Sequence, residues 1–213
     1  LHVRNITAGY PHIASRWELQ ENGVHVARLV YEARHDYDGF FVSDFDGAGV
    51  EAAREVVDVP VIDGFLPQCM AAMTLAGTYS IIAPDDSLVS LDLSHPRMIG
   101  AAEALASIRS LNMSVAMLVD HDETVRHVCS EARQAIEQDG ALAIVLGCTA
   151  MIGVADEVSA YLKEASKRAS RSLDVPVMDP NICGITYLQA LVRARLSQCR
   201  RSYKFPTSLV SND

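Results

Sequence analysis

Asp58-Val-Pro-Val-Ile-Asp63 recurs, with one substitution, as Asp174-Val-Pro-Val-Met-Asp179. Upstream of each copy lies an apolar, strand-like run that ends in a glycine-containing turn, namely Gly39-Phe-Phe-Val-Ser-Asp44 and Ala143-Ile-Val-Leu-Gly-Cys148. The sequence therefore predicts two copies of one strand–turn–helix–strand unit, in which Asp44 and Cys148 take equivalent places. If the copies face each other, these two side chains lie across a shared cleft, as a two-sided proton-transfer site requires.

The composition indicates a globular α/β chain. Its 213 residues allow two lobes of roughly 100 residues each, and 49% of them are apolar while 21% are charged. A net charge of −9 argues against a nucleic-acid surface. Residues 141–155 form the longest nearly uncharged apolar stretch, which is too short to span a membrane. Five scattered cysteines without a CxxC pair predict no metal, no disulfide framework and a cytoplasmic location with reduced thiols.

Strand-like and helix-like segments alternate along the chain. We expect strands at residues 1–7, 39–43, 59–62, 79–83, 113–119, 142–146 and 175–178. We expect helices at 22–35, 48–57, 66–75, 97–111, 121–140, 156–170 and 181–199, a polar turn at 85–90 and a loose tail from 202. This order predicts parallel sheets flanked by helices, arranged as two pseudo-symmetric lobes: residues 1–75 plus 181–213, and residues 76–180.

Ligands of such folds bind outside the carboxyl ends of the strands. The predicted ends carry a set of polar or turn-forming residues: Asp44, Asp63, Pro84, Asp120, Cys148 and Asp179. The active site is therefore expected there, in the cleft between the lobes.

Cys148 is the strongest catalytic candidate. A free cysteine is often only a small buried filler, but this one stands in the turn rather than inside the strand. Backbone N–H groups of the following helix could receive an anion there, and their dipoles are expected to lower the thiol pKa from about 8.5. Thr149 could add a hydroxyl and an N–H donor to the same site.

The other candidates have ordinary structural explanations beside the functional ones. Asp44, Asp46 and Asp63 could simply cap helices or form turns, and only its equivalence to Cys148 singles out Asp44. Asp179 ends a strand and opens a helix, with ligand contact as the alternative. His95 is a lone histidine that could face the cleft. No Walker or GxGxxG motif supports a nucleotide cofactor.

These residues resemble the aspartate/glutamate/hydantoin racemase superfamily, most of all its hydantoin and allantoin racemases. The resemblance lies in Leu146-Gly-Cys-Thr149, in the Val-Pro-Val-Met-Asp179 that follows, and in the first turn. There, Asp44-Phe-Asp-Gly-Ala-Gly-Val50-Glu-Ala-Ala-Arg-Glu55 is similar to the family's Cys-Phe-x-Asp-Pro-Gly-Leu-x-x-Ala-Arg-Glu. Family members also open with a strand ending in Asn-Pro-Asn, which this chain lacks. We expect either a trimmed start or an incomplete first lobe.

The resemblance implies catalysis without metal or coenzyme, in a homo-oligomer that takes a small-molecule substrate. One thiolate removes the proton α to a carbonyl, and a thiol on the opposite face returns one. Cys148 matches the second of these cysteines, and Asp44 replaces the first. The residues expected to line the substrate are Thr149, Phe45, Asp46, Gly47, Ala83, Pro84 and Asp179.

Asp44 changes the expected mechanism, because a carboxylate is a far weaker base than a thiolate. Burial and a neighbouring thiolate could each raise its pKa. An Asp44/Cys148 acid–base pair acting as a racemase keeps most of the family pattern. The alternatives are a single-thiol decarboxylase like the arylmalonate decarboxylases, an enzyme with Cys148 as nucleophile, and a non-catalytic small-molecule binder.

Overall fold

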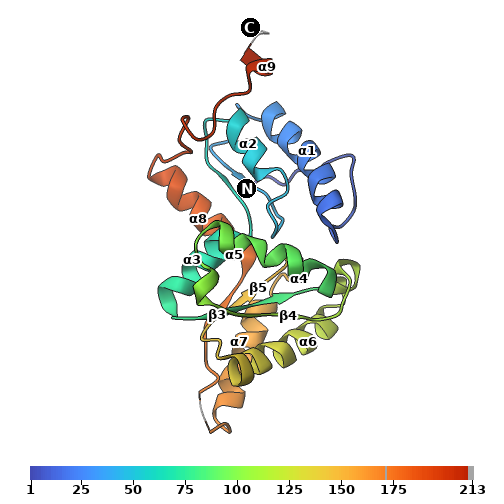
Figure 1. Cartoon of the computed structure of the whole chain (residues 1–213), viewed down its shortest axis with the longest axis vertical. Helices are drawn as coiled ribbons and strands as arrows, with labels where there is room; N and C mark the ends of the chain where they lie inside the picture. The colour runs from blue at the N-terminus through green and yellow to red at the C-terminus, as the bar shows by residue number, and fades with distance from the viewer. Residues whose placement is uncertain (171, 211–213) are drawn as a thin grey trace.

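The computed structural model describes residues 1–170 and 172–210, and shows two parallel sheets flanked by helices (Figure 1). The smaller sheet pairs β1 (Phe40–Phe41) with β2 (Val61–Ile62). The larger sheet has the order β4-β3-β5-β6. Its strands are β3 (Tyr79–Ala83), β4 (Leu105–Ser110), β5 (Ile144–Leu146) and β6 (Val177–Met178). Every pairing is parallel, so the predicted α/β class is confirmed.

The larger sheet is buried on both faces. Ile82, Ile144 and Leu146 pack on one face with residues of α6 (His121–Gln134) and α7 (Val154–Ser166). Tyr79, Ile81 and Val145 turn to the other face and pack with residues of α3 (Phe65–Leu75). Successive strand residues point to opposite faces, so apolar residues at every position are what a sheet covered on both sides requires. Figure 1 shows α6 and α7 below this sheet and α3 above it.

The smaller sheet belongs to a separate apolar cluster. Val30 of α1 (Arg16–Glu32) and Ala53 of α2 (Val50–Val56) pack there with strand residues. Helix α8 (Pro180–Arg193), orange-red in Figure 1, contacts β1, β2 and α3. The chain after α8 stays on this side, because the Gln198 amide donates to the carbonyl of Val57 at 2.6 Å. The proposed lobe bounds at residues 75 and 180 stay a prediction.

The repeated segments occupy equivalent places in the two sheets. Phe41 pairs with Ile62 in one, and Val145 pairs with Met178 in the other. After each of these second strands an aspartate caps a helix through the backbone N–H groups two and three residues on. Asp63 accepts from Phe65 and Leu66, and Asp179 accepts from Asn181 and Ile182. The internal duplication predicted from the sequence is therefore visible in the register.

Two predictions for residues 85–111, which follow β3, are wrong. Residues 85–90 are not a polar turn, since α4 (Asp86–Asp92) starts there with Asp85 as its N-cap. Residues 97–111 are not one helix: α5 (Ser94–Met98) ends before Gly100, whose φ is +74°. A short 3₁₀ turn, η1 (Ala102–Ala104), then leads into β4. Pairing with β3 has overridden the helical preference of an alanine-rich segment.

Residues 113–119 form no strand either. The backbone turns at Asn112, with φ +53°, and η2 (Val115–Val119) is a 3₁₀ helix, because β4 already holds the edge of the sheet. Asp120 therefore follows a helix rather than a strand end, although it does cap α6 as expected. That helix continues as a π-helical turn, η3 (Ala135–Asp139), and stops at Gly140 as predicted.

The ends of the chain also differ from expectation. Residues 1–7 form no strand, and Leu1 and Val3 are exposed. In the predicted loose tail, α9 (Thr207–Val210) is helical and Leu209 packs against the small-sheet cluster. Residues 211–213 of that tail lie outside the described residues.

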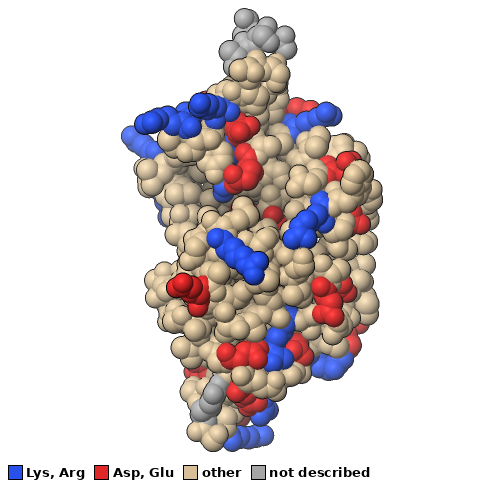
Figure 2. Space-filling model, in the orientation of Figure 1, with Lys and Arg blue, Asp and Glu red and all other residues tan. Residues whose placement is uncertain are grey.

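Charge is distributed over the surface in both signs. On the face shown in Figure 2, Lys and Arg side chains are interspersed with Asp and Glu among the described residues. In the part of the chain that the structure describes, no helix is both long enough and apolar enough to cross a bilayer.

Candidate active site

The turns after β1 and β5 contact each other. Asp44 lies three residues beyond Phe41, and Cys148 lies three residues beyond its equivalent, Val145. Their chain neighbours are directly bonded, because the Thr149 hydroxyl donates to the carbonyl oxygen of Ser43 at 3.0 Å. Each helix that follows begins six residues beyond the candidate, α2 at Val50 and α7 at Val154. The structure thus brings the two predicted catalytic residues to one place.

Helix α8 reinforces this contact. The side-chain amide of Asn181 donates to the carbonyl of Thr149 at 2.8 Å. Gly64 fits tightly beside the same residue, since an added Cβ would lie 2.9 Å from the Thr149 methyl group. The Gly64 N–H donates to the carbonyl of Asp44 at 2.9 Å. The relative position of Asp44 and Cys148 is therefore fixed by packing and hydrogen bonds from both halves.

The carboxyl group of Asp44 is held by the backbone of its own turn. Its Oδ2 accepts from the N–H of Ala48 at 2.7 Å. Burial raises the pKa of Asp44, and the charge of Asp46 raises it further, while the N–H groups of Ala48 and Asp46 oppose the shift. The predicted rise through burial is confirmed, and the second cause is another carboxylate rather than a thiolate. Asp44 is therefore a stronger base than an ordinary aspartate.

The prediction for the Cys148 thiol is wrong in sign. Burial raises its pKa to about 12, and only the N–H of Ala150 opposes this. The charges of Asp44, Asp46 and Asp92 raise it further. Backbone dipoles at the turn are outweighed because a thiolate here would be poorly solvated and surrounded by carboxylates. At neutral pH Cys148 keeps its proton, which suits a proton donor.

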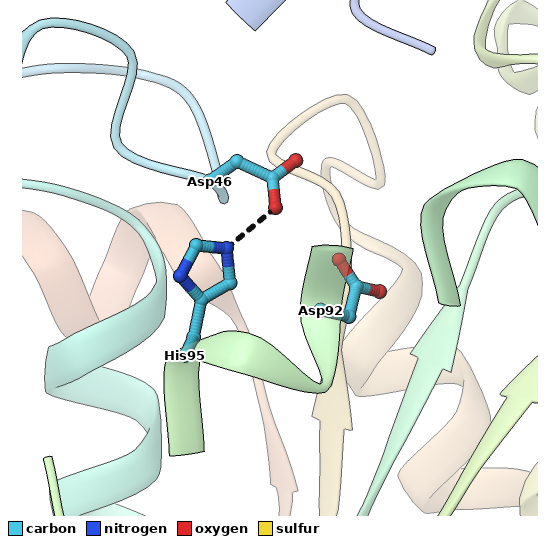
Figure 3. Close-up of side chains that lie close together, drawn as sticks. All are labelled: Asp46, Asp92 and His95. Atoms are coloured by element: carbon cyan, nitrogen blue, oxygen red, sulfur yellow. Dashed lines mark hydrogen bonds and ion pairs between the residues drawn. The ribbon is translucent and has the colours of Figure 1, made fainter. Parts of the chain in front are cut away.

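A second polar group adjoins this site, formed by Asp46 and by the corner between α4 and α5 (Figure 3). The His95 Nε2 atom lies 2.7 Å from Asp46 Oδ1, and their side chains are only 13% and 6% exposed. The His95 ring packs against Phe65, with centroids 5.3 Å apart. Asp92 is 1% exposed. Burial and the charges of Asp46 and Asp44 raise the pKa of Asp92.

Asp92 was not among the residues predicted at the site, and His95 was expected only as a lone histidine. The available signal was helical spacing, since Leu88, Leu91 and Asp92 recur at intervals that place them on one face of a helix. Reading residues 85–90 as a turn hid that face. Once α4 is recognised, Asp92 is its last residue and is buried like Leu88 and Leu91, while His95 follows in α5 and packs against Phe65.

The residues predicted to line the substrate occupy varied environments. Phe45 is 2% exposed and meets Phe65 edge-on, as a core residue does. Gly47 has φ +72° and lies beside Asp63. Ala83 and Pro84 are buried at the carboxyl end of β3, and the hydroxyl of Thr149 and one oxygen of Asp179 are engaged in internal hydrogen bonds. Their contacts with a substrate stay a prediction.

A carboxyl group and a thiol stand in adjoining turns at the carboxyl ends of parallel strands from two duplicated units. This arrangement defines an α/β racemase-like class of enzyme. The chain belongs to the Asp/Glu/hydantoin racemase family, whose profile matches residues 1–188. The predicted family and its enzymatic nature are thereby confirmed.

Individual relatives agree with this assignment. A hydantoin racemase from Paenarthrobacter aurescens is 29% identical over 83% of this chain and 71% of its own length. The chain spans 64% to 71% of the length of the curated hydantoin racemases that it matches. An allantoin racemase structure from Pseudomonas fluorescens has a TM-score of 0.85 and 26% identity, covering 96% of this chain and 83% of that one. One from Klebsiella pneumoniae has a TM-score of 0.84 at 24% identity, covering 94% and 78%, and supports the fold.

Proposed function

We propose that this protein is a racemase or isomerase that moves a proton at a carbon α to a carbonyl, using Asp44 and Cys148 as its acid–base pair. The observation that carries the proposal is their equivalence in strand register, together with the hydrogen bond that joins their turns. Membership of the racemase family supplies the reaction class. The substrate and the roles of the two side chains are the proposed part.

The two groups suit opposite halves of the reaction. The pKa of Cys148 is raised to about 12, so its thiol supplies a proton to a carbanion formed in front of it. Asp44, whose pKa is also raised, accepts the α proton from the opposite face of the substrate more readily than an ordinary carboxylate would. In the reverse direction the roles exchange by microscopic reversibility. The carbon acid must be an activated one, because the Asp44 carboxylate is a weak base and the Cys148 thiolate is scarcely populated at neutral pH.

The electrostatics favour a neutral or singly charged substrate. Four carboxyl groups gather at or beside the site, those of Asp44, Asp46, Asp63 and Asp92, and they influence one another's charge. A dicarboxylate would add two negative charges to this cluster. A hydantoin- or amino-acid-like compound, with an α C–H next to a carbonyl, fits the chemistry with less repulsion.

The decisive assay is hydrogen–deuterium exchange at the α carbon, followed by proton NMR in D₂O over hydantoins, allantoin, amino acids and substituted malonates. The wild-type protein should exchange the α proton of at least one compound. Cys148→Ala and Asp44→Asn should each lower that rate by about 100-fold or more, as expected for loss of a general acid or base. Asn keeps the shape of the Asp44 side chain and its place beside the Ala48 N–H.

A gain-of-function variant tests the position of Asp44 separately. If Asp44 occupies the place of a family thiol, Asp44→Cys should raise exchange on a hydantoin. Its control is Asp63→Cys, which puts a thiol at a neighbouring carboxylate that caps α3. Equal or lower exchange in Asp44→Cys would count against the proposed placement.

Other outcomes identify the alternatives. Release of carbon dioxide from a substituted malonate, without exchange on hydantoins, would indicate a single-thiol decarboxylase. A thioester or thioether trapped on Cys148 would indicate a nucleophile. Binding of a compound without turnover would indicate a non-catalytic binder. A homo-oligomeric assembly stays a prediction, for which light scattering of the purified protein is the measurement.

A further inference from the structure

The group formed by Asp46, Asp92 and His95 is distinct from the acid–base pair and has its own unexplained feature. Among the described residues, neither oxygen of Asp92 has a hydrogen-bond partner, and both are inaccessible to solvent. Asp92 is the last residue of α4, directly before the corner with α5, and is 1% exposed. A buried carboxyl group without a partner is strongly unfavourable, so native proteins retain one when something compensates for it.

The surroundings of Asp92 are rich in negative charge. Besides burial, the charge of Asp46, a hydrogen bond to Asp46 when Asp92 is protonated, and the charge of Asp44 all raise the pKa of its carboxyl group. His95 contacts Asp46 rather than Asp92, at 2.7 Å. The side chains therefore leave Asp92 facing acidic groups with no cation bonded to it among the described residues. A bound cation would offset the repulsion among the carboxylates and would give the oxygen atoms of Asp92 a partner.

We propose that Asp46, Asp92 and His95 bind a divalent transition-metal ion. Each residue offers one ligand atom, and these atoms lie within 4.8 Å of one another. In a tetrahedral site with metal–ligand distances of about 2.0–2.1 Å the ligand atoms stand roughly 3.3 Å apart, so small side-chain rotations suffice. Figure 3 shows the three side chains converging from the turn after β1 and from the corner between α4 and α5.

The ligand set indicates which ions to expect. Two carboxylates and one imidazole suit Mn²⁺, Zn²⁺ or Fe²⁺, since carboxylates favour the harder ions and imidazole the later ones. Three protein ligands leave at least one position for water or for an oxygen atom of a bound molecule. Phe45 and Phe65 pack around the His95 ring and would hold its orientation.

A metal site here departs from the expectation of no metal that was drawn from the sequence. That expectation rested on the cysteine pattern, and no cysteine belongs to this group. The ligands are also far apart in the chain, since Asp46 and His95 are separated by 49 residues. Only the fold brings them together. The proton transfers proposed for Asp44 and Cys148 are those of the metal-free protein, since a cation bound to Asp46 and Asp92 would offset charges that raise the pKa of both groups.

The experiment is a Mn²⁺ titration of untagged, chelator-treated protein, with free Mn²⁺ counted by electron paramagnetic resonance and no substrate present. Mn²⁺ is chosen because it prefers carboxylate ligands and has little affinity for the free thiols of the chain. We expect one ion per chain with a Kd below about 10 μM. Asp92→Ala and His95→Gln should each weaken binding by at least about 100-fold, since losing even an outer partner of a ligand costs 10- to 100-fold.

A matched control separates the site from general acidity. His121 and Glu157 form a histidine–carboxylate pair at 2.6 Å on the surface, and they belong to no group of three ligand-bearing residues within the described ranges. His121→Gln should leave Mn²⁺ binding unchanged. Asp92→Asn keeps the shape of the side chain but removes its charge, so the metal-free variant should melt at or above the temperature of the wild type and lose the stabilisation that Mn²⁺ confers.

Two results would overturn the proposal. One is the absence of stoichiometric binding of Mn²⁺ and, in a parallel titration, of Zn²⁺. The other is wild-type affinity in Asp92→Ala, which would place any bound ion elsewhere, with a proton shared between Asp46 and Asp92 as the remaining explanation of the buried pair. Neither result bears on α-proton exchange, so failure of this site and failure of the proposed function are distinguishable.

Discussion

In the first copy of the repeated unit, Asp44 lies three residues beyond the paired residue Phe41. In the second copy, Cys148 lies three residues beyond Val145. The following turns match as well, since Gly49 and Gly153 both take left-handed conformations as N-caps, with φ of +72° and +77°. The backbone plan is thus repeated while the side chains have diverged. The repeated backbone determines the position of the reactive group, whereas the type of residue at that position differs between the two copies.

Because the side chains differ, the carboxyl groups of the site lie on the side of the first copy. The first copy contributes Asp44 and Asp46, and the helix corner adds Asp92, whereas the second copy has the Cys148 thiol in place of Asp44. The carboxylates and burial together raise the pKa of that thiol. Burial and these carboxylates therefore favour a protonated thiol over a thiolate at Cys148, as the proposed proton donor requires.

The largest expected effect is on thiol reactivity. Cys199 is exposed and the N–H groups of Arg201 and Ser202 lower its pKa, whereas the pKa of Cys148 is raised to about 12. At pH 8 only about one Cys148 in 10,000 is a thiolate, so iodoacetamide should alkylate it at least about 100-fold more slowly than Cys199. Peptide mass spectrometry over time measures both rates.

The pH dependence of the same reaction has a definite sign. A thiolate forms as pH rises, so alkylation of Cys148 should accelerate about tenfold per pH unit from pH 8 to pH 10, while that of Cys199 levels off earlier. Asp44→Asn should speed the reaction of Cys148 at pH 8, because one charge that raises its pKa is gone. A Cys148 rate that is flat with pH would contradict the electrostatic account of the site.

The two capping glycines provide the next test. A Cβ at Gly49 would lie 2.2 Å from the carbonyl oxygen of Gly23, where α1 and α2 meet, while the nearest atom at Gly153 is His121 Cε1 at 3.9 Å. Gly153→Ala should therefore cost about 1 kcal/mol for its left-handed backbone alone. Gly49→Ala should cost more than about 3 kcal/mol, because overpacking against the backbone adds to the same strain. Urea denaturation of both variants measures the difference, and equal losses would disprove it.

The smallest expected effect concerns the two equivalent aspartate caps. Asp179→Ala should lower the free energy of unfolding by about 1 kcal/mol, the ordinary value for a lost N-cap. Asp63→Ala should cost less than half of that, since burial raises the pKa of Asp63 and so makes its charge unfavourable in the folded state. A larger loss at Asp63 than at Asp179 in urea unfolding would show that its cap outweighs its burial.

The structural features that were predicted best lie in the two repeated segments of the sequence. The strands at 61–62 and 177–178, the caps at Asp63 and Asp179, and the equivalence of Asp44 and Cys148 could all be predicted from the Asp-Val-Pro-Val segments. The buried strand Tyr79–Ala83 was also predicted correctly. A short, uncharged and mostly apolar run indicates a buried strand whichever strands pair with it. These features depend on local sequence alone.

Prediction failed where tertiary pairing decides the structure. Strand β4 is half-buried at the sheet edge and alanine-rich, so its helical preference was visible while its pairing with β3 was not. The Asp46–Asp92–His95 group depends on where the corner after α4 lies relative to the turn after β1. The raised pKa of Cys148 depends on carboxylates from both regions. None of these spatial relationships can be predicted from residues that are close together in the sequence.

The most direct measurement starts from one enantiomer of an exchanging substrate in D₂O and follows deuterium in both enantiomers at early times. If Asp44 and Cys148 act from opposite faces, the product enantiomer carries deuterium while the remaining substrate keeps its original proton. Deuterium that appears at once in the unreacted enantiomer would show that a single group removes and returns the proton. It would contradict the two-sided site.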